Sequence, residues 1–170
     1  VFKAQTAPAT LTPQEQLVLA QPAIPYNLDA WDGYAIARET LLGTARALDK
    51  NLVVLAGDTH NAWANELQDR NGNAVGVEFA TSSVTSPGFE EYLPNENPAT
   101  LAGALQQLIA PLKYCDTSRR GYMVLTATAS ECRADWVYVN TITSRNYTAS
   151  TDKSLKVVAG AAGVGRIVAA

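Results

Sequence analysis

The sequence predicts an α/β fold with mixed sheets, and three observations carry that prediction. Residues 34–48 repeat apolar side chains at helical spacing. The apolar run LVVLA, residues 52–56, follows this helix directly and is typical of a strand buried on both faces. Residues 120–130 and 134–144 alternate apolar and polar side chains. This alternation predicts an antiparallel hairpin with one face in the core.

The remaining elements are predicted from turn chemistry and shorter patterns. The first thirty residues are rich in Pro, Ala, Thr and Gln, so we expect an extended loop with a helical turn near residues 12–20. Residues 74–84 are a second strand candidate. Residues 99–112 predict a helix stopped by Pro111, because proline lacks the N–H that a helix needs. The glycine-rich tail, residues 154–169, predicts a final short strand.

Composition limits the classes of protein that fit this chain. The 170 residues are about one domain's worth, and 47% are apolar while 17% are charged. The formal charge of −3 offers no basic patch for a nucleic acid, and no apolar run is long enough for a membrane span. The chain begins without an initiator methionine or a signal-peptide pattern. That beginning indicates a processed chain or one piece of something longer.

The two cysteines, Cys115 and Cys132, lie beside polar turn residues, and their spacing suits no CxxC metal motif. We expect one bridge between neighbouring elements in an oxidising compartment, with two unpaired thiols as the alternative.

The motif with the most chemistry follows the strand at 52–56. Gly57 can adopt backbone angles that other residues avoid, which would allow a sharp exit from the strand. Asp58 and His60 come next, and His60 is the only histidine of the chain. Ligands of open α/β sheets bind at the carboxyl ends of strands. A carboxylate and an imidazole placed there can bind one metal ion, or two ions about 3.5–4 Å apart.

A second interpretation of this loop stays open. Asp-x-His is often a hydrogen-bonded pair or a helix cap, and two ligands are too few for a closed metal centre. Asn61 and Asn65 add carbonyl oxygens, which suit hard cations. Trp63 either lines the pocket or packs in the core.

Two other polar groups have both a structural and a functional interpretation. Arg119 and Arg120 precede a strand, where a solvated turn is favoured over bidentate phosphate binding. The hydroxyls of residues 81–86 follow a strand and either face the site or hydrogen-bond their own loop.

Several stretches of the sequence resemble one protein family. NLVVLAGDTHNAWANEL (51–67) and VGVEFATSSVTSPGFEEYL (75–93) resemble the C-terminal region of the PhoD family, the alkaline phosphatase D-like metallophosphoesterases. Residues 27–42, residues 119–142 and the tail resemble the family in the same order. The resemblance implies the C-terminal half of a calcineurin-like metallophosphoesterase fold, with two mixed β-sheets packed face to face and flanked by helices. Residues 1–170 would then be the C-terminal portion of a single catalytic domain.

The resemblance also implies a metal centre with Fe(III) and Ca(II), although other divalent metals suit the same ligands. By analogy, the catalytic pair would be Asp58 on the calcium side and His60 on the iron. Asn61 would support the metal ligands or contact the substrate phosphate. Trp63, from its position a few residues after the loop, would bind substrate if it lines the pocket, with core packing as the alternative. The family's other ligands (a cysteine, aspartates, a tyrosine and an asparagine) belong to an N-terminal half that this chain lacks. Neither Cys115 nor Cys132 lies in a matching motif.

The resemblance therefore implies a metal-dependent phosphoric ester hydrolase that releases phosphate from mono- or diesters. Its partners would be a phosphate ester substrate and an N-terminal fragment or chain of the same enzyme. The protein would be secreted or periplasmic. The alternative is a metal-free α/β binding or interaction module on the same scaffold.

Overall fold

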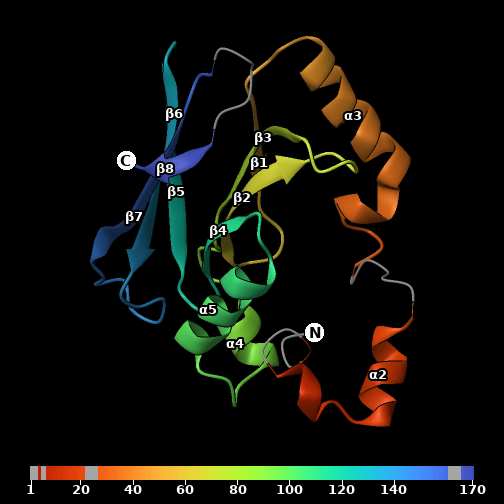
Figure 1. Cartoon of the computed structure of the whole chain (residues 1–170). Helices are drawn as coiled ribbons and strands as arrows, with labels where there is room; N and C mark the ends of the chain where they lie inside the picture. Colours follow the sequence, from red (N-terminus) through yellow and green to blue (C-terminus); the bar gives the residue numbers. More distant parts are fainter. Residues whose placement is uncertain (1–3, 5–6, 22–26, 161–165) are drawn as a thin grey trace. The chain divides into compact units, whose positions relative to one another are not determined.

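The computed structural model describes residues 4, 7–21, 27–160 and 166–170, which belong to two compact units, residues 1–40 and 41–170 (Figure 1). The first unit holds two short 3-10 helices, Pro8–Thr10 (η1) and Trp31–Tyr34 (η2), and the α-helix α2, Pro13–Leu19. Helix α3, Ala35–Ala47, begins in the first unit and ends in the second.

Helix α2 confirms the helical turn expected near residues 12–20. Thr12 accepts a hydrogen bond from the Glu15 N–H, and the Glu15 carboxylate accepts one from the Thr12 N–H. This capping box satisfies two N–H groups that the helix itself leaves unpaired. Pro13 occupies the first turn, where a missing N–H costs nothing.

Helix α3 matches the helix predicted over 34–48, and its Leu42 is fully buried. It is preceded by the tight turn of η2, in which a Cβ on Gly33 would lie 1.8 Å from the Leu28 carbonyl oxygen. Only glycine fits such a close backbone approach. Asp32 lies inside η2 and forms an ion pair with Arg38 at 3.2 Å.

The first sheet of the second unit is mixed. Its strands are β1 (Leu52–Ala56), β2 (Ala62–Gln68), β3 (Ala74–Ala80) and β4 (Leu112–Asp116), in the order β1-β3-β2-β4. Strands β1 and β3 are parallel, whereas β2 is antiparallel to both β3 and β4. The expected strand at 52–56 is confirmed, but its expected burial on both faces is wrong. Strand β1 lies at the sheet edge, and Leu55 is 56% exposed.

Strands β2, β4 and β7 were not expected from the sequence. The polar residues of β2 suggest a loop, but Asn65 lies inside the strand and donates to Glu78 Oε1 of β3 at 3.0 Å. Asn65 is therefore not a neighbour of Asp58 on the loop. Helix α5, Pro98–Leu108, ends before Pro111 and leaves room for β4 to begin at Leu112.

The second sheet is antiparallel throughout. Its order is β5 (Gly121–Ala127), β6 (Glu131–Val139), β7 (Ala149–Val158) and β8 (Ile167–Ala169). The predicted hairpin is confirmed, with a turn over residues 128–130. The final short strand is confirmed as β8. Residues 161–165 of the glycine-rich tail lie outside the described residues.

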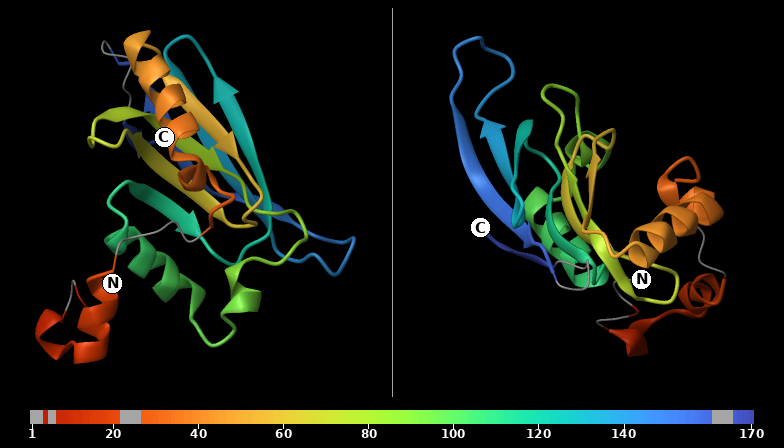
Figure 2. Two further views of the ribbon diagram at one scale, coloured as in Figure 1. Left: turned by 90° about the vertical axis from the view of Figure 1, so that its right-hand side faces the viewer. Right: turned by 90° about the horizontal axis from the view of Figure 1, so that it is seen from above.

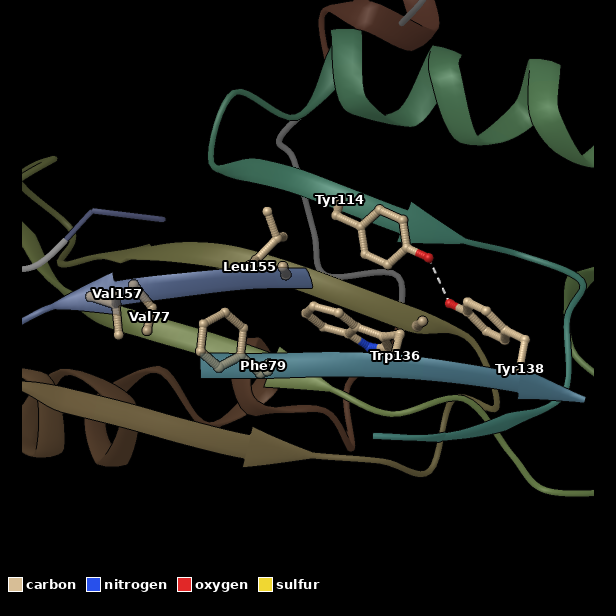
Figure 3. Close-up of a cluster of buried hydrophobic side chains, with 10 residues drawn as sticks. Val77, Phe79, Tyr114, Trp136, Tyr138, Leu155 and Val157 are labelled. Carbon is tan, nitrogen blue, oxygen red and sulfur yellow. Dashed lines mark hydrogen bonds between the residues drawn. The ribbon is translucent and has the colours of Figure 1, made fainter. Parts of the chain in front are cut away.

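The two sheets pack face to face and enclose the core, as Figure 2 shows. The fully buried Trp136 of β6 lies at its centre, edge-on to Phe79 at 5.8 Å between ring centroids. Its indole N–H donates to the Ala80 carbonyl at 2.9 Å, which ties β6 to the end of β3. The hydroxyls of Tyr114 and Tyr138 lie 2.6 Å apart (Figure 3). Burial against both sheets is the main source of stability. Figure 3 labels the larger core side chains: Val77, Phe79, Tyr114, Trp136, Tyr138, Leu155 and Val157.

The expected disulfide is wrong, because both thiols are free. Cys115 lies on β4 in the first sheet and Cys132 on β6 in the second. The Cys115 thiol contacts the Ala102 carbonyl of α5 at 3.5 Å, and burial raises its pKa to about 11. Among the described residues, no helix has the length and apolar character needed to cross a membrane.

Candidate functional site

The candidate site is the loop of residues 57–61, between the end of β1 and the start of β2. Because β1 and β3 are parallel, with Ala56 opposite Ala80, the segments that follow them leave the sheet at the same edge. The Thr81 N–H donates to the Ala56 carbonyl at 3.0 Å, and the Ser83 N–H donates to the His60 carbonyl at 3.4 Å. The topology therefore places loop 57–61 beside the segment that begins at Thr81.

The backbone of this loop is unusual at Asp58 and His60. Asp58 has φ 66° and His60 has φ 61°, both in the left-handed region. The expectation that Gly57 supplies the unusual angle is wrong, since its φ lies outside that region. Aspartate and histidine tolerate left-handed angles better than most residues, yet the conformation still costs about 1–2 kcal/mol per residue. Such strain concentrates at functional sites.

The imidazole of His60 is held by a backbone carbonyl. Its Nδ1 lies 2.8 Å from the Pro87 oxygen. A carbonyl oxygen can only accept, so Nδ1 carries the proton. In the neutral ring, Nε2 then has the free lone pair, which is the form that binds a metal ion or takes up a proton.

Asn61 and Trp63 both support the loop. Asn61 is fully buried, donates to the Thr59 carbonyl at 2.7 Å, and accepts from the Phe89 N–H at 3.1 Å. The half-buried Trp63 donates from its indole N–H to the Thr59 hydroxyl at 2.8 Å. Its ring lies edge-on to Phe89, 5.9 Å between centroids. Both side chains therefore hold the residue that separates Asp58 from His60.

Sequence reasoning missed the position of Arg120. A solvated turn is wrong for this residue, because its side chain is 11% exposed and forms an ion pair with Glu90 of helix α4, Phe89–Tyr92. Arg120 Nη1 also donates to the Ser118 carbonyl at 2.8 Å. Within the described part of the chain, Arg120 Nε and Glu90 Oε2 are buried without a hydrogen-bond partner. Burial lowers the pKa of Arg120. No local pattern could reveal this pair, since its members are 30 residues apart.

The neighbouring polar groups are used within the protein. Arg119 pairs with Asp116 and Asp152, and its guanidinium lies 4.0 Å from the centre of the Tyr138 ring. The Ser83 hydroxyl accepts from the N–H groups of residues 85 and 86, which confirms hydrogen bonding of the loop to itself. Neither group is directed at a free phosphate.

The donor set fits one side of a metal centre. A carboxylate oxygen and an unprotonated imidazole nitrogen are both ordinary metal ligands. Across residues 4, 7–21, 27–160 and 166–170, no three His, Cys, Asp or Glu side chains gather where they could hold an ion. Asp58 and His60 alone are too few ligands for a closed metal centre.

The mixed α/β architecture with two sheets packed face to face is consistent with part of a metallophosphoesterase-like fold. Residues 3–136 match the family model described as PhoD-like phosphatase. The chain belongs to the PhoD-like phosphatase family, as the sequence resemblance predicts.

Two relatives show how much of the family's architecture the chain spans. Alkaline phosphatase D of Bacillus subtilis (strain 168) is 29% identical over 136 residues, which cover 76% of this chain and 22% of that protein. A solved structure of PhoD superposes with a TM-score of 0.63 and 25% identity, over 85% of this chain and 27% of that one. The chain thus spans about a quarter of the length of the relatives it matches.

Proposed function

We propose that this chain supplies one side of the metal centre of a PhoD-like phosphatase, a metal-dependent phosphoric ester hydrolase. The observation that carries the proposal is the loop after β1. Asp58 and His60 of this loop have strained, left-handed backbone angles. His60 Nδ1 donates to the Pro87 carbonyl, which leaves Nε2 free. Membership of the PhoD-like phosphatase family supports the same reaction class.

Each residue has a distinct role in this proposal. The Asp58 carboxylate would supply the charge that holds a hard cation, Ca(II) by family resemblance, and neutral His60 would bind Fe(III) or another transition metal through Nε2. Bound ions would neutralise phosphate oxygens and activate water for attack on phosphorus. Asn61 is too deeply buried to reach a substrate, so its role would be to hold the loop. Trp63, at the edge of the same loop, would line the substrate pocket.

The missing ligands would come from an N-terminal portion of the same enzyme. Within the described residues, no strand pairs with the outer edge of β1. A cavity of about 310 Å³ opens beside that edge, lined by residues that include Leu52, Leu55 and Leu125. A second hollow beside the same edge is lined by residues that include Leu55, Val84 and Tyr122, and these three apolar side chains are 45–60% exposed. Open strand edges favour pairing, and exposed apolar patches are typical of interfaces, so the N-terminal portion would pack against this edge.

We further propose that the enzyme is secreted or periplasmic, as its family resemblance suggests. Whether the preferred substrate is a monoester or a diester would depend on loops contributed by the N-terminal portion.

The test combines metal content with activity in the enzyme that contains this chain. Asp58→Ala and His60→Ala should each lose most bound metal and most hydrolysis of phosphate esters. Asp49→Ala is a matched control, because Asp49 shares the left-handed backbone with φ 51° but follows α3 in a turn. This control should keep its metal. Unchanged metal content and ligand binding in the two loop variants would instead favour the metal-free binding module.

A further inference from the structure

One peptide unit beside the candidate loop is gripped at both of its polar ends. Its carbonyl, from Pro87, accepts from His60 Nδ1 at 2.8 Å. Its N–H, from Gly88, donates to Glu90 Oε1 at 3.2 Å. The same carboxylate oxygen receives Arg120 Nη2. Arg120, Glu90, the Pro87–Gly88 peptide and His60 therefore form one continuous chain of hydrogen bonds.

We propose that Glu90 and Arg120 are positioning residues that set the tautomer and ring orientation of His60 through the Pro87–Gly88 peptide. This inference deepens the proposed function and rests on it for the role of the free Nε2. Glu90 and Arg120 do not contact the imidazole, so they would act on it only through this peptide.

The physical effect is polarisation of the Pro87–Gly88 peptide by the Glu90 carboxylate, which Arg120 holds in place. An N–H that donates to a carboxylate forms a charge-assisted bond. Such a bond makes the peptide nitrogen more electron-rich and pushes electron density onto the carbonyl oxygen of the same peptide, which makes that oxygen a stronger acceptor. A stronger acceptor favours the proton on Nδ1 over Nε2. Hydrogen bonds of this kind commonly fix the tautomer and orientation of histidines that bind metals.

Stability does not explain the ion pair. The pair is part-buried, with 11% of the Arg120 side chain and 30% of the Glu90 side chain exposed, and the loss of hydration in such a pair offsets much of the attraction. The pair of Arg120 and Glu90 also leaves Arg120 Nε and Glu90 Oε2 without partners. Each unpaired buried polar atom costs about 1–3 kcal/mol. Stability therefore does not account for the pair. Its hydrogen bond to the Gly88 N–H, in the peptide whose carbonyl accepts from His60, gives it a positioning role instead.

Gly88 makes this arrangement possible. A Cβ at position 88 would lie 2.4 Å from Asn61 Oδ1 and 3.0 Å from Glu90 Oε2. Its φ of −106° is ordinary, so glycine is needed here for space and not for backbone angle. Without a side chain, Gly88 leaves room for Glu90 at its own N–H and for Asn61 at the N–H of Phe89.

The test measures the protonation of the two imidazole nitrogens of His60 by nitrogen-15 NMR. The sample is metal-free protein labelled at histidine, kept together with any polypeptide that co-purifies. His60 is the only histidine of this chain, and His60→Gln identifies its signals. At about pH 8, above the usual histidine titration range, the wild type should show a protonated Nδ1 and an unprotonated Nε2. Glu90→Gln and Arg120→Met should shift the ring toward a mixture of tautomers. The exposed neighbour variant Glu91→Gln should leave it unchanged.

A second measurement keeps the proposal testable if one variant folds poorly. Glu90→Asp retains the charge but shortens the reach to the Gly88 N–H, so it should also mix the tautomers. Circular dichroism verifies folding in each case. An unchanged Nδ1–H tautomer in folded Glu90→Gln, Glu90→Asp and Arg120→Met would overturn the proposal, as would a wild-type ring protonated on Nε2.

Metal binding separates this inference from the proposed function. Zn²⁺ is a suitable probe ion because imidazole binds it well. Loss of the positioning pair should weaken Zn²⁺ binding about 10–100-fold, as is usual for residues that orient a ligand. If Glu90→Gln mixes the tautomers while His60→Ala binds Zn²⁺ as tightly as the wild type, the positioning role stands and the proposed metal centre fails.

Discussion

The core between the sheets and the loop after β1 follow opposite rules. In the core, the Trp136 indole N–H is hydrogen-bonded and the Tyr114 and Tyr138 hydroxyls satisfy each other. Around the loop, two non-glycine residues have left-handed backbones, and buried atoms of Arg120 and Glu90 have no partner. The core is arranged for stability, whereas the loop after β1 contains features that lower it. Where a protein departs from local rules in this way, function is the usual reason.

The largest expected effect is on the core side of this comparison. Trp136→Ala should lower the free energy of unfolding by about 3–5 kcal/mol, because it removes the largest fully buried side chain. Trp136→Phe keeps most of the volume but strands the Ala80 carbonyl, so it should cost about 1–3 kcal/mol. Urea denaturation measures both. Equal losses would mean that the hydrogen bond, and not packing, dominates at this position.

The tyrosine pair makes the core sensitive to alkali. Burial raises the pKa of Tyr114 to about 12, above the ordinary value of 10, and raises the pKa of Tyr138 as well. The folded state therefore holds these protons more tightly than the unfolded state. Their stabilisation is complete below about pH 10 and is lost as the pH rises toward 12. Denaturation midpoints measured across this range should fall.

Removing both hydroxyls, by Tyr114→Phe with Tyr138→Phe, should flatten that fall, whereas Tyr122→Phe on the exposed side of β5 should not. An identical alkaline fall in the double variant would assign it to other groups.

The loop side is tested by separating strain from chemistry at one residue. Asp58→Gly should be more stable than Asp58→Ala by about 1 kcal/mol, since glycine adopts φ 66° without a Cβ clash. Both variants should lose the proposed metal ligand equally. Thermal unfolding gives the difference in stability, and metal analysis gives the common loss. If alanine proved as stable as glycine, position 58 would carry no backbone strain.

The smallest effect is expected at Gly57. A Cβ there would meet no atom within 4 Å, and its φ lies outside the left-handed region. Gly57→Ala should therefore change the free energy of unfolding by no more than about 0.5 kcal/mol. A loss above about 1 kcal/mol in chemical denaturation would show that the strain of the loop extends to this glycine.

Periodicity was enough to predict much of the fold. Helix α3, strands β1 and β3, and the β5–β6 hairpin follow from apolar spacing. Strand β2 does not, because Asn65 satisfies its amide on Glu78 across the sheet. Strand β4 does not either, since the helical pattern before Pro111 runs almost into it. Patterns along the chain do not show what pairs across it.

The same limit applies to the candidate site. Asp58 and His60 stand out in the sequence because the motif is local. The tautomer of His60 depends on Pro87, 27 residues away, and the burial of Arg120 depends on Glu90, 30 residues away. These two contacts can be recognised only in the three-dimensional structure.

The strand order has a consequence for how the protein folds. Strand β3 lies between β1 and β2, although it follows both in sequence. The β2–β3 hairpin spans a five-residue turn, residues 69–73, and can form from near neighbours, whereas β1 must pair with β3 at an offset of 24 residues, Leu52 to Gly76. Distant pairings of this kind form slowly. We expect the hairpin to form first and β1 to dock on it afterwards, so that His60 reaches Pro87 among the last events of folding.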